Sequence, residues 1–246
     1  MTQPRAYKTR AVVLRGRVLG EADRIFTLFS TERGKIDAVA KGIRRSKSQL
    51  AGRLEFGNEC QFGMHRGRSL DVIASAEIVT AHWERLVEPE RFAVFSLVAE
   101  VIDALCEPDQ ALPDVYALLT GMLAAIAATD RPRALLPRFS LRLLDLLGVA
   151  PPVSRCIRCD RPLEERGYCD PEAGGIIGDN CRDRWRDLLE LDAADLENLR
   201  ALAARKGSRA AVRATPRVAR AIEDLLAHHL GRRPKAGAHL SDFVTP

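Results

Sequence analysis

The sequence is poor in aromatic residues and has no long apolar run. Phe, Trp and Tyr together make up 5% of the 246 residues, so a surface that binds bases mainly by stacking is not expected. No uncharged apolar stretch approaches the ~20 residues that a membrane-spanning helix needs. The basic N-terminus lacks the apolar core of a secretory signal. We therefore expect a cytoplasmic protein that does not contact a membrane.

Recognisable catalytic motifs are also missing. The sequence contains no GxxxxGK[ST] phosphate loop, no HExxH metal-binding helix and no GxSxG nucleophile turn. None of the five histidines belongs to a motif that pairs a nucleophile with a base. An enzyme such as an ATPase or a nuclease is therefore not expected.

Positive charge is present, but it is unevenly distributed along the chain. Residues 1–80 carry 15 Lys and Arg against 8 Asp and Glu, residues 81–150 carry 6 against 10, and residues 151–246 carry 17 against 15. The net charge of +5 therefore originates in the first segment. Such asymmetry suggests that this segment binds a polyanion. A solvated basic face is the alternative.

The first 80 residues show the pattern of β-strands. Apolar and polar residues alternate from Tyr7 to Leu19, and turn-like sequences separate the later runs of strand-forming residues. About five strands in about 75 residues is the size of a small closed barrel such as the OB-fold, which commonly presents a strand face and loops to nucleic acid. Strand alternation places Phe26 and Phe29 in the core rather than against a base. The later strands are predicted at 25–29, 36–40, 56–64 and 70–79.

From residue 89 the apolar period becomes helical. Proline residues mark the starts of the predicted helices, and their apolar stripes are interpreted as packing core. The stretch 150–181 is loop-like and rich in cysteine. Helices are predicted from Pro89 to before Pro108, from Pro113 through Ile126, from Pro132 to Leu147, and at 185–191, 195–204 and 218–230.

These patterns predict an α+β protein, with an N-terminal OB-fold β-barrel followed by an all-helical domain that carries a zinc-binding module of four cysteines. The barrel is expected to bind nucleic acid. The predicted boundaries are 1–80 for the barrel, 81–150 for the first part of the helical domain, 151–182 for the zinc module and 183–246 for the last helical part with its basic tail.

The cysteines of the loop-like stretch predict a metal site. Two of them form a CxxC pair, whose tight turn can point two thiolates at one tetrahedral ion. Four thiolates would close the site, so that a zinc ion there would stabilise the fold and activate no water. A disulfide is disfavoured in the cytoplasm, and a redox pair normally begins a helix beside a βαβ pattern; both remain alternatives. The four cysteines are Cys156, Cys159, Cys169 and Cys181.

The remaining two cysteines, Cys60 and Cys106, fall in a predicted strand and on a predicted helix face. We expect both to be buried and to have no role in metal binding.

A cationic loop follows the third predicted strand. Residues 39–55, VAKGIRRSKSQLAGRLE, contain no acid before Glu55. Such a cluster can neutralise backbone phosphates, an interaction that is independent of base sequence and falls steeply with salt. In the loop the predicted phosphate contacts are Lys41, Arg44, Arg45, Lys47 and Arg53, and along the barrel they are Arg10, Arg15, Arg17, Arg24, Arg33 and Lys35.

Three stretches of the sequence form a combination of motifs: YKTRAVVLRGRVLGEADRIFTLFSTERGKIDAVAKGIRRSKS, RFSLRLLDLLGVAPPVSRCIRC and CDPEAGGIIGDNC. Taken together, and in this order, they resemble the RecO family of bacterial recombination-repair proteins. The resemblance implies a mediator that binds single- and double-stranded DNA without sequence specificity and anneals strands coated with single-strand-binding protein. It also implies recombinase (RecA) loading together with RecR, with RecF as a further partner. The alternative is a zinc-containing RNA- or transcription-associated adaptor without annealing activity.

The sequence departs from the family pattern at the metal module. Zinc-containing relatives usually have a second CxxC pair in the closing segment, whereas here Gly178 stands at the first cysteine position. Cys169 is the predicted replacement ligand, supplied from the neighbouring strand, and a degenerate site is the alternative.

The resemblance also implies that the helical domain receives the acidic, apolar tail of the single-strand-binding protein. The last helix has suitable chemistry, although a solvated helix face with a basic C-terminal turn is the alternative. The candidate residues are Arg217, Arg220, Leu225, Leu226 and Arg232.

Overall fold

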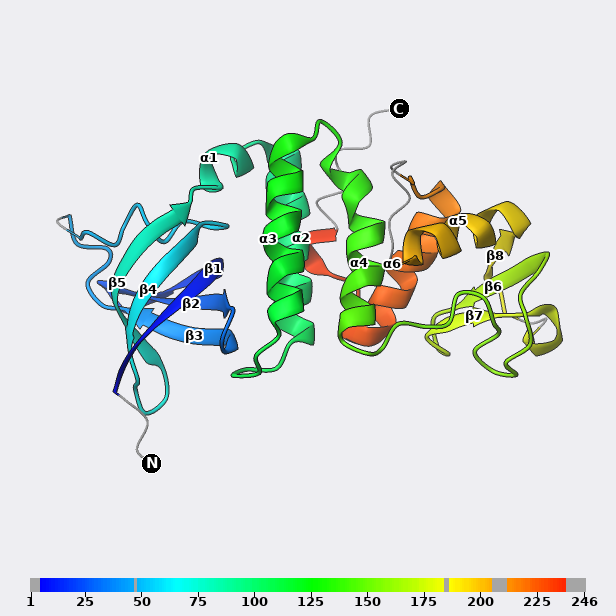
Figure 1. Cartoon of the computed structure of the whole chain (residues 1–246), viewed down its shortest axis with the longest axis horizontal. Helices are drawn as coiled ribbons and strands as arrows, with labels where there is room; N and C mark the ends of the chain where they lie inside the picture. The colour runs from blue at the N-terminus through cyan, green and yellow to red at the C-terminus, as the bar shows by residue number, and fades with distance from the viewer. Residues whose placement is uncertain (1–4, 47, 184–185, 205–211, 238–246) are drawn as a thin grey trace. The chain divides into compact units, whose positions relative to one another are not determined.

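The computed structural model describes residues 5–46, 48–183, 186–204 and 212–237 (Figure 1). The chain divides into two compact units. Unit 1 comprises residues 1–132 together with 235–246, and unit 2 comprises residues 133–234. The predicted α+β class is confirmed, and each unit contains both strands and helices.

Five strands of unit 1 form a closed barrel with the neighbour order β1-β2-β3-β5-β4. Adjacent strands are antiparallel, except for β3 and β5, which run parallel where Ala38 and Val39 pair with Asp71 and Val72. A small closed barrel of five strands is the OB-fold that the sequence predicts. The strands are β1 (Ala6–Leu19), β2 (Asp23–Ser30), β3 (Gly34–Ala40), β4 (Glu59–His65) and β5 (Asp71–Thr80).

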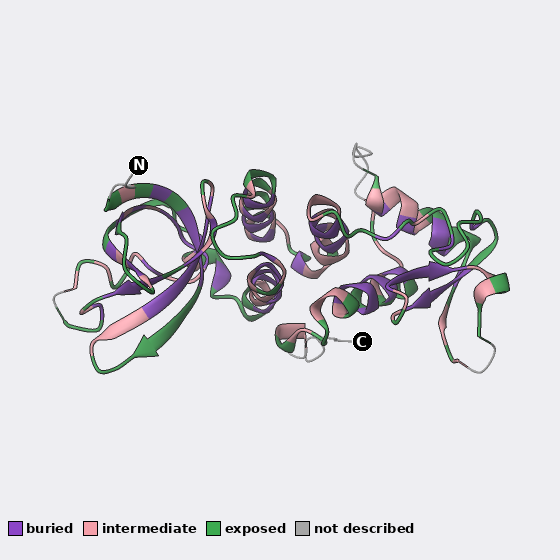
Figure 2. Cartoon of the chain, turned by 90° about the horizontal axis from the view of Figure 1, so that it is seen from below, coloured by how far each residue is buried: buried purple, intermediate pink, exposed green. Residues whose placement is uncertain are grey.

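Alternate side chains of these strands fill the barrel, whose strands curl into a ring in Figure 2. Phe26, Phe62 and Met64 are each at most 1% exposed and pack in this core. Phe29 is also fully buried. As predicted, Phe26 and Phe29 are therefore core residues, and neither ring is accessible to a nucleic-acid base. Cys60 lies in the same core, and Cys106 is buried too.

Helices α1 (Trp83–Leu86), α2 (Pro89–Leu105) and α3 (Pro113–Ala128) complete unit 1. Gly34 has a positive φ of 62°, and a Cβ atom on it would lie 1.9 Å from the carbonyl oxygen of Gln110, so only glycine fits this approach. The Lys35 ammonium donates to the carbonyl of Asp103, 2.5 Å away. The barrel and these helices therefore form one packed unit that continues past residue 80.

Unit 2 contains helices and a three-stranded sheet with the order β7-β6-β8. The short helix η1 (Pro132–Leu135) leads into α4 (Leu136–Leu146). Asp192 caps the N-terminus of α5 by accepting a hydrogen bond from the Asp195 N–H, and Thr215 caps α6 by accepting one from the Val218 N–H. The elements of the unit are α4 (Leu136–Leu146), β6 (Arg166–Asp170), β7 (Gly175–Ile177), η2 (Asp179–Cys181), β8 (Leu189–Asp192), α5 (Ala193–Ala203) and α6 (Pro216–Leu230).

The sheet of unit 2 is the main departure from the sequence-based prediction. The domain is not all helical, and the stretch 150–181 contains two strands. Leu189–Asp192 is a strand where a helix was predicted at 185–191, and Trp185 lies outside the described residues. Tyr168 pairs with Glu190 across the sheet. A four-residue strand whose pairing partner lies more than twenty residues away in the sequence is hard to predict from its own residues, because strand formation depends on the neighbouring strand.

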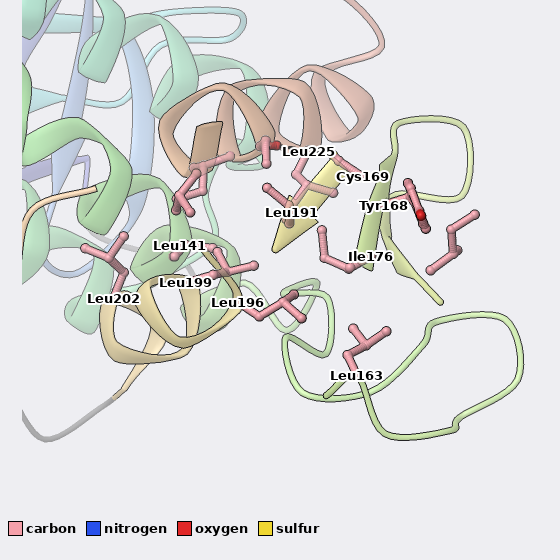
Figure 3. Close-up of a cluster of buried hydrophobic side chains, with 14 of the residues drawn as sticks. Leu141, Leu163, Tyr168, Cys169, Ile176, Leu191, Leu196, Leu199, Leu202 and Leu225 are labelled. Atoms are coloured by element: carbon pink, nitrogen blue, oxygen red, sulfur yellow. Dashed lines mark hydrogen bonds between the residues drawn. The ribbon is translucent and has the colours of Figure 1, made fainter. Parts of the chain in front are cut away.

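The core of unit 2 lies between this sheet and the helices (Figure 3). Leu191 of β8, Leu199 of α5 and Leu225 of α6 are fully buried in it, and Leu141 of α4 is 3% exposed. None of the helices in the described part of the chain is long and apolar enough to cross a membrane.

Candidate nucleic-acid interface and metal site

The cationic loop after β3 is anchored to the β1–β2 turn by its backbone. Gly42 adopts a positive φ of 65°, and its N–H donates to the Asp23 carboxylate at 2.7 Å. The Arg44 N–H donates to the carbonyl of Ala22 at 3.0 Å, and the Arg44 guanidinium donates to the carbonyl of Glu21 at 3.0 Å. The anchoring role of Asp23 was not predicted from the sequence.

Three cations of this loop are exposed and have no carboxylate partner in the part of the chain that the structure describes. The side chains of Lys41, Arg44 and Arg45 are exposed. Within the described residues, no carboxylate forms an ion pair with any of the three. Lys47, which was predicted to share this role, lies outside the described residues. Unpaired surface cations can exchange their counterions for backbone phosphates.

Strand register places one barrel arginine, Arg24, beside the loop. Arg24 of β2 pairs with Ala40, the residue before Lys41, and also with Val18 of β1. The Arg24 guanidinium lies 5.5 Å from the centre of the Phe26 ring. Arg17 pairs with Ile25, so it lies on the other face of the strands from Arg24, where it makes one long contact of 3.9 Å with the Asp37 carboxylate. We call the surface of Arg24, Lys41, Arg44 and Arg45 the basic end.

The basic end is bordered by apolar side chains. Val18 is 60% exposed and Leu19 is 43% exposed, and both precede the β1–β2 turn. Exposed aliphatic residues beside free cations suit a nucleic-acid backbone, whose sugars are less polar than its phosphates. The exposure of these two residues could not be predicted, because alternation alone does not distinguish an exposed valine from a buried one.

Other cations predicted to bind phosphate have carboxylate partners in the structure. Arg15 lies 3.1 Å from the Asp103 carboxylate, and Lys35 lies 3.6 Å from the same group. The Arg33 guanidinium contacts the carboxylates of Asp71 and Asp109. These ion pairs give the three residues a structural role that charge counting did not reveal.

Arg10 and Arg53 are also engaged. Arg10 donates two hydrogen bonds to Glu59, at 2.7 and 3.0 Å, and the Tyr116 hydroxyl donates to the same carboxylate at 2.6 Å. Burial would raise the pKa of Glu59, but the hydrogen bonds from Arg10, Tyr116 and Thr80 bring this pKa below its ordinary value. Arg53 is half-buried and donates to the carbonyl of Ala76 at 2.8 Å.

Three cysteines of unit 2 form a cluster that could hold a metal ion. The sulfur atoms of Cys156, Cys159 and Cys181 all lie within 4.8 Å of one another. The N–H of Asp160 donates to the carbonyl of Cys156 at 2.9 Å and closes the turn of the CxxC pair, and the N–H of Cys181 donates to the carbonyl of Gly178 at 2.9 Å. Two tight turns, from segments about twenty residues apart, thus bring the thiols together.

Backbone amides point at the most buried of these sulfurs. Cys156 is 2% exposed. Burial would raise its pKa, but the N–H groups of Gly178, Cys159 and Arg158 hold the pKa at about 7. N–H donors around a sulfur favour the thiolate, which is the form that binds metal. The donor set therefore fits a thiophilic ion such as zinc.

Cys169 is not part of this cluster. Its side chain is 1% exposed in the core of unit 2, where its sulfur lies 3.7 Å from the carbonyl oxygen of Ala221 in α6 (Figure 3). Burial raises the pKa of this thiol to about 12. The structure thus corrects the predicted ligand set, because β6 directs Cys169 toward α6 rather than toward the other three thiols.

The buried carboxylate of Asp170 follows Cys169 in β6. Asp170 is fully buried and accepts hydrogen bonds from Arg158 at 2.6 Å and from Arg186 at 3.1 Å. Burial would raise the pKa of Asp170, but the backbone N–H of Ala173 and the two guanidinium groups hold it below the usual value. Because Arg158 belongs to the CxxC turn, this carboxylate ties that turn to the sheet.

The predicted partner-binding residues of α6 differ in exposure. Leu225 is fully buried and Leu226 is 3% exposed, so both are core residues, and the prediction that they form a surface is wrong. Arg232 is exposed and donates to the carbonyl of Arg233 at 3.1 Å. Arg217 and Arg220 line an open pocket of about 770 Å³.

That pocket combines charged and apolar side chains. Leu188, Leu189 and Pro171 supply its apolar lining, and Arg233 adds a third guanidinium. Its arginines are paired within the unit: Arg220 lies 3.2 Å and Arg233 lies 2.6 Å from the Asp224 carboxylate.

Comparison with known proteins gives matches over both units. The family described as "Recombination protein O N terminal" matches residues 1–82, and the family described as "Recombination protein O C terminal" matches residues 87–237. A DNA repair protein RecO of Heliobacterium modesticaldum is 36% identical over 217 residues, covering 80% of this chain and 78% of that protein. A DNA repair protein RecO of Cutibacterium acnes is 38% identical over 183 residues, covering 72% of this chain and 74% of that protein.

Proposed function

The chain belongs to the RecO family of recombination proteins, and we propose that it is a non-catalytic mediator that binds single- and double-stranded DNA without sequence specificity. In this role it anneals complementary strands coated with single-strand-binding protein. It also assists RecR, with RecF as a further partner, in loading the recombinase RecA on chromosomal DNA. The family assignment supports a role in DNA repair and recombination; the binding mode and the partners are the proposal.

The basic end is the observation that carries this proposal. Lys41, Arg44 and Arg45 are exposed and have no carboxylate partner within the described residues, and the phenylalanine rings of the barrel strands, Phe26, Phe29 and Phe62, are buried. Binding would therefore depend on backbone charge rather than on base stacking. Such binding suits annealing, because the bases of each strand stay free to pair.

Annealing of complementary oligonucleotides coated with single-strand-binding protein tests the function. We expect the full-length protein to accelerate duplex formation on coated strands, as followed by fluorescence quenching between end-labelled strands. An RNA- or transcription-associated adaptor would bind nucleic acid without this acceleration. Annealing no faster than the protein-free control would therefore contradict the proposal and favour the adaptor.

For the single-strand-binding protein, we propose that its acidic, apolar tail binds at the pocket of Arg217 and Arg220. The apolar lining and the three guanidinium groups support this assignment, whereas the carboxylates of Asp187, Glu190 and Asp224, which line the same pocket, oppose an acidic ligand. The tail would have to compete with Asp192, Asp195 and Asp224 for these arginines. The same annealing assay tests the contact, because coating with a tail-deleted single-strand-binding protein should remove most of the acceleration.

We propose further that Cys156, Cys159 and Cys181 hold a structural zinc ion. We expect purified protein to contain about one zinc per chain by elemental analysis, since clustered thiolates bind zinc strongly. Cys156→Ser should lose most of the metal and also destabilise unit 2. Cys169→Ser is the matched control and should keep its zinc; metal loss in that variant would return Cys169 to the ligand set.

A further inference from the structure

The thiol cluster provides three protein ligands for a metal ion that normally takes four. Cys156, Cys159 and Cys181 converge, and within the described residues no other His, Cys, Asp or Glu joins them. Cys169, the other cysteine of the module, has its sulfur turned toward α6. Structural zinc sites are almost always four-coordinate and closed, whereas sites with three protein ligands keep one position for an external ligand.

The place of the missing ligand is occupied by Gly178. Gly178 and Cys181 have the spacing of a CxxC pair, and their turn is closed by the hydrogen bond from the Cys181 N–H to the Gly178 carbonyl. The Gly178 N–H points at the sulfur of Cys156. The turn is therefore formed like a ligand pair, but its first residue carries no side chain.

Nothing in the backbone requires glycine at this position. Gly178 has φ −88° and ψ 170°, an extended conformation that any residue can adopt. A Cβ atom there would have one neighbour, the Cδ2 atom of Leu163 at 3.5 Å, which is an ordinary contact. By contrast, a Cβ atom on Gly174, in the turn before β7, would lie 2.6 Å from a side-chain atom of His228, and one on Gly175, the first residue of β7, would lie 2.7 Å from a side-chain atom of Ile157. The space beside Gly178 is thus free for a ligand.

We propose that the three thiolates hold their metal ion with the fourth coordination position open on the Gly178 side, where it accepts an external ligand with a soft donor atom, such as a small thiol. Solvent reaches the site, because Cys159 is exposed and Cys181 is only half-buried. The metal is consequently more exchangeable than in a closed site of four cysteines. This inference rests on the metal binding proposed above and is independent of DNA binding.

Cobalt substitution of the full-length protein tests the open position. The S-to-Co(II) charge-transfer absorption grows with the number of bound thiolates, and the d–d bands report the tetrahedral ligand field. We expect the cobalt form of the wild type to show a three-thiolate spectrum that changes when 2-mercaptoethanol is added. Gly178→Cys should show a stronger, four-thiolate spectrum that does not respond to the added thiol.

Zinc affinity gives a second measurement. One additional thiolate should tighten zinc binding by more than about tenfold, as measured by competition with a chromophoric chelator, since even partners outside the ligand shell change metal affinity by about 10–100-fold. Gly178→Ala is the matched control, because it adds the Cβ atom without a donor, and it should behave like the wild type in both experiments.

The outcomes separate this inference from the rest of the proposal. A wild-type cobalt spectrum that matches Gly178→Cys and ignores the thiol would mean that the chain itself supplies a fourth ligand, and the open position would be disproved while zinc binding stands. Failure of the reduced wild type to bind cobalt or zinc would overturn both the metal site and this inference. The annealing activity, measured separately, would be unaffected by either conclusion.

Discussion

Reversing Arg44, Arg45 and Lys47 to Glu is expected to weaken DNA binding by at least about tenfold at low salt. Each reversal removes a cation that can displace counterions from the phosphate chain and places a negative charge in the same position. Arg44 and Arg45 are exposed and have no carboxylate partner in the described part of the chain, so their loss breaks no internal ion pair. Reversing Arg44 also removes its hydrogen bond to the Glu21 carbonyl, so circular dichroism during thermal unfolding must show an unchanged midpoint before the loss is assigned to binding.

Fluorescence anisotropy with labelled single- and double-stranded oligonucleotides at several salt concentrations measures this effect. The slope of log affinity against log salt should become shallower by about three, one unit for each lost phosphate contact. Arg5, Lys8 and Arg68 are also exposed barrel cations, and Arg5 and Lys8 lie near the start of β1, away from the basic end. Reversing these three to Glu changes the net charge equally and is the matched control. Equal losses in both triple variants would mean that only net charge matters and would contradict a specific role for the basic end.

Replacing Asp170 by Ala is expected to destabilise unit 2 by about 3–5 kcal/mol, because two guanidinium groups and two backbone N–H groups lose their common acceptor and a hydrogen bond to a charged group contributes about 1.5–3 kcal/mol. Asp170 is fully buried, and its carboxylate accepts hydrogen bonds from Arg158, Arg186 and the backbone N–H groups of Glu172 and Ala173. Circular dichroism during urea unfolding measures the loss. Arg158→Ala removes a partner that is 44% exposed, so this control should cost only about 1 kcal/mol or less. A smaller loss for Asp170→Ala than for Arg158→Ala would contradict the central role of the carboxylate.

The pH dependence of the same unfolding provides a further check on Asp170. Its pKa in the folded protein lies below the usual value of 3.8. The stabilisation is therefore present above that usual value and is lost as the pH falls through the folded-state pKa. The difference in unfolding free energy between the wild type and Asp170→Asn should accordingly narrow in acid, below about pH 4.

The barrel was largely predictable because its signals are local. Alternation in 7–19 and glycine-containing turns define the strands within a few residues, and prolines at 89 and 113 begin the helices as expected. The sheet of unit 2 was not predictable in the same way. β7 has three residues and β8 has four, and each depends on pairing with β6 rather than on its own composition.

The functional residues show a similar division. The cationic loop was visible in the sequence, and of the four cysteines predicted as ligands from their spacing, Cys156, Cys159 and Cys181 do lie together. Ion pairing could not: the carboxylates of Asp103 and Glu59 lie far along the chain from the arginines that they engage. The position of the Cys169 side chain could not be predicted, because it depends on which face of the short strand β6 lies against α6. Leu225 and Leu226 were wrongly predicted to be on the surface, because the sequence does not tell which face of α6 packs in the core.

The continuity of unit 1 past residue 80 has a practical consequence for domain exchange between relatives. The family boundary in the sequence falls at residues 82–87, yet the Tyr116 hydroxyl binds the buried carboxylate of Glu59, and Gly34 lies against the backbone of Gln110. A chimaera joined at the family boundary would inherit a barrel from one parent and its supporting helices from another. A junction near residue 132 keeps these contacts within one parental sequence, and is the one that should yield a folded hybrid.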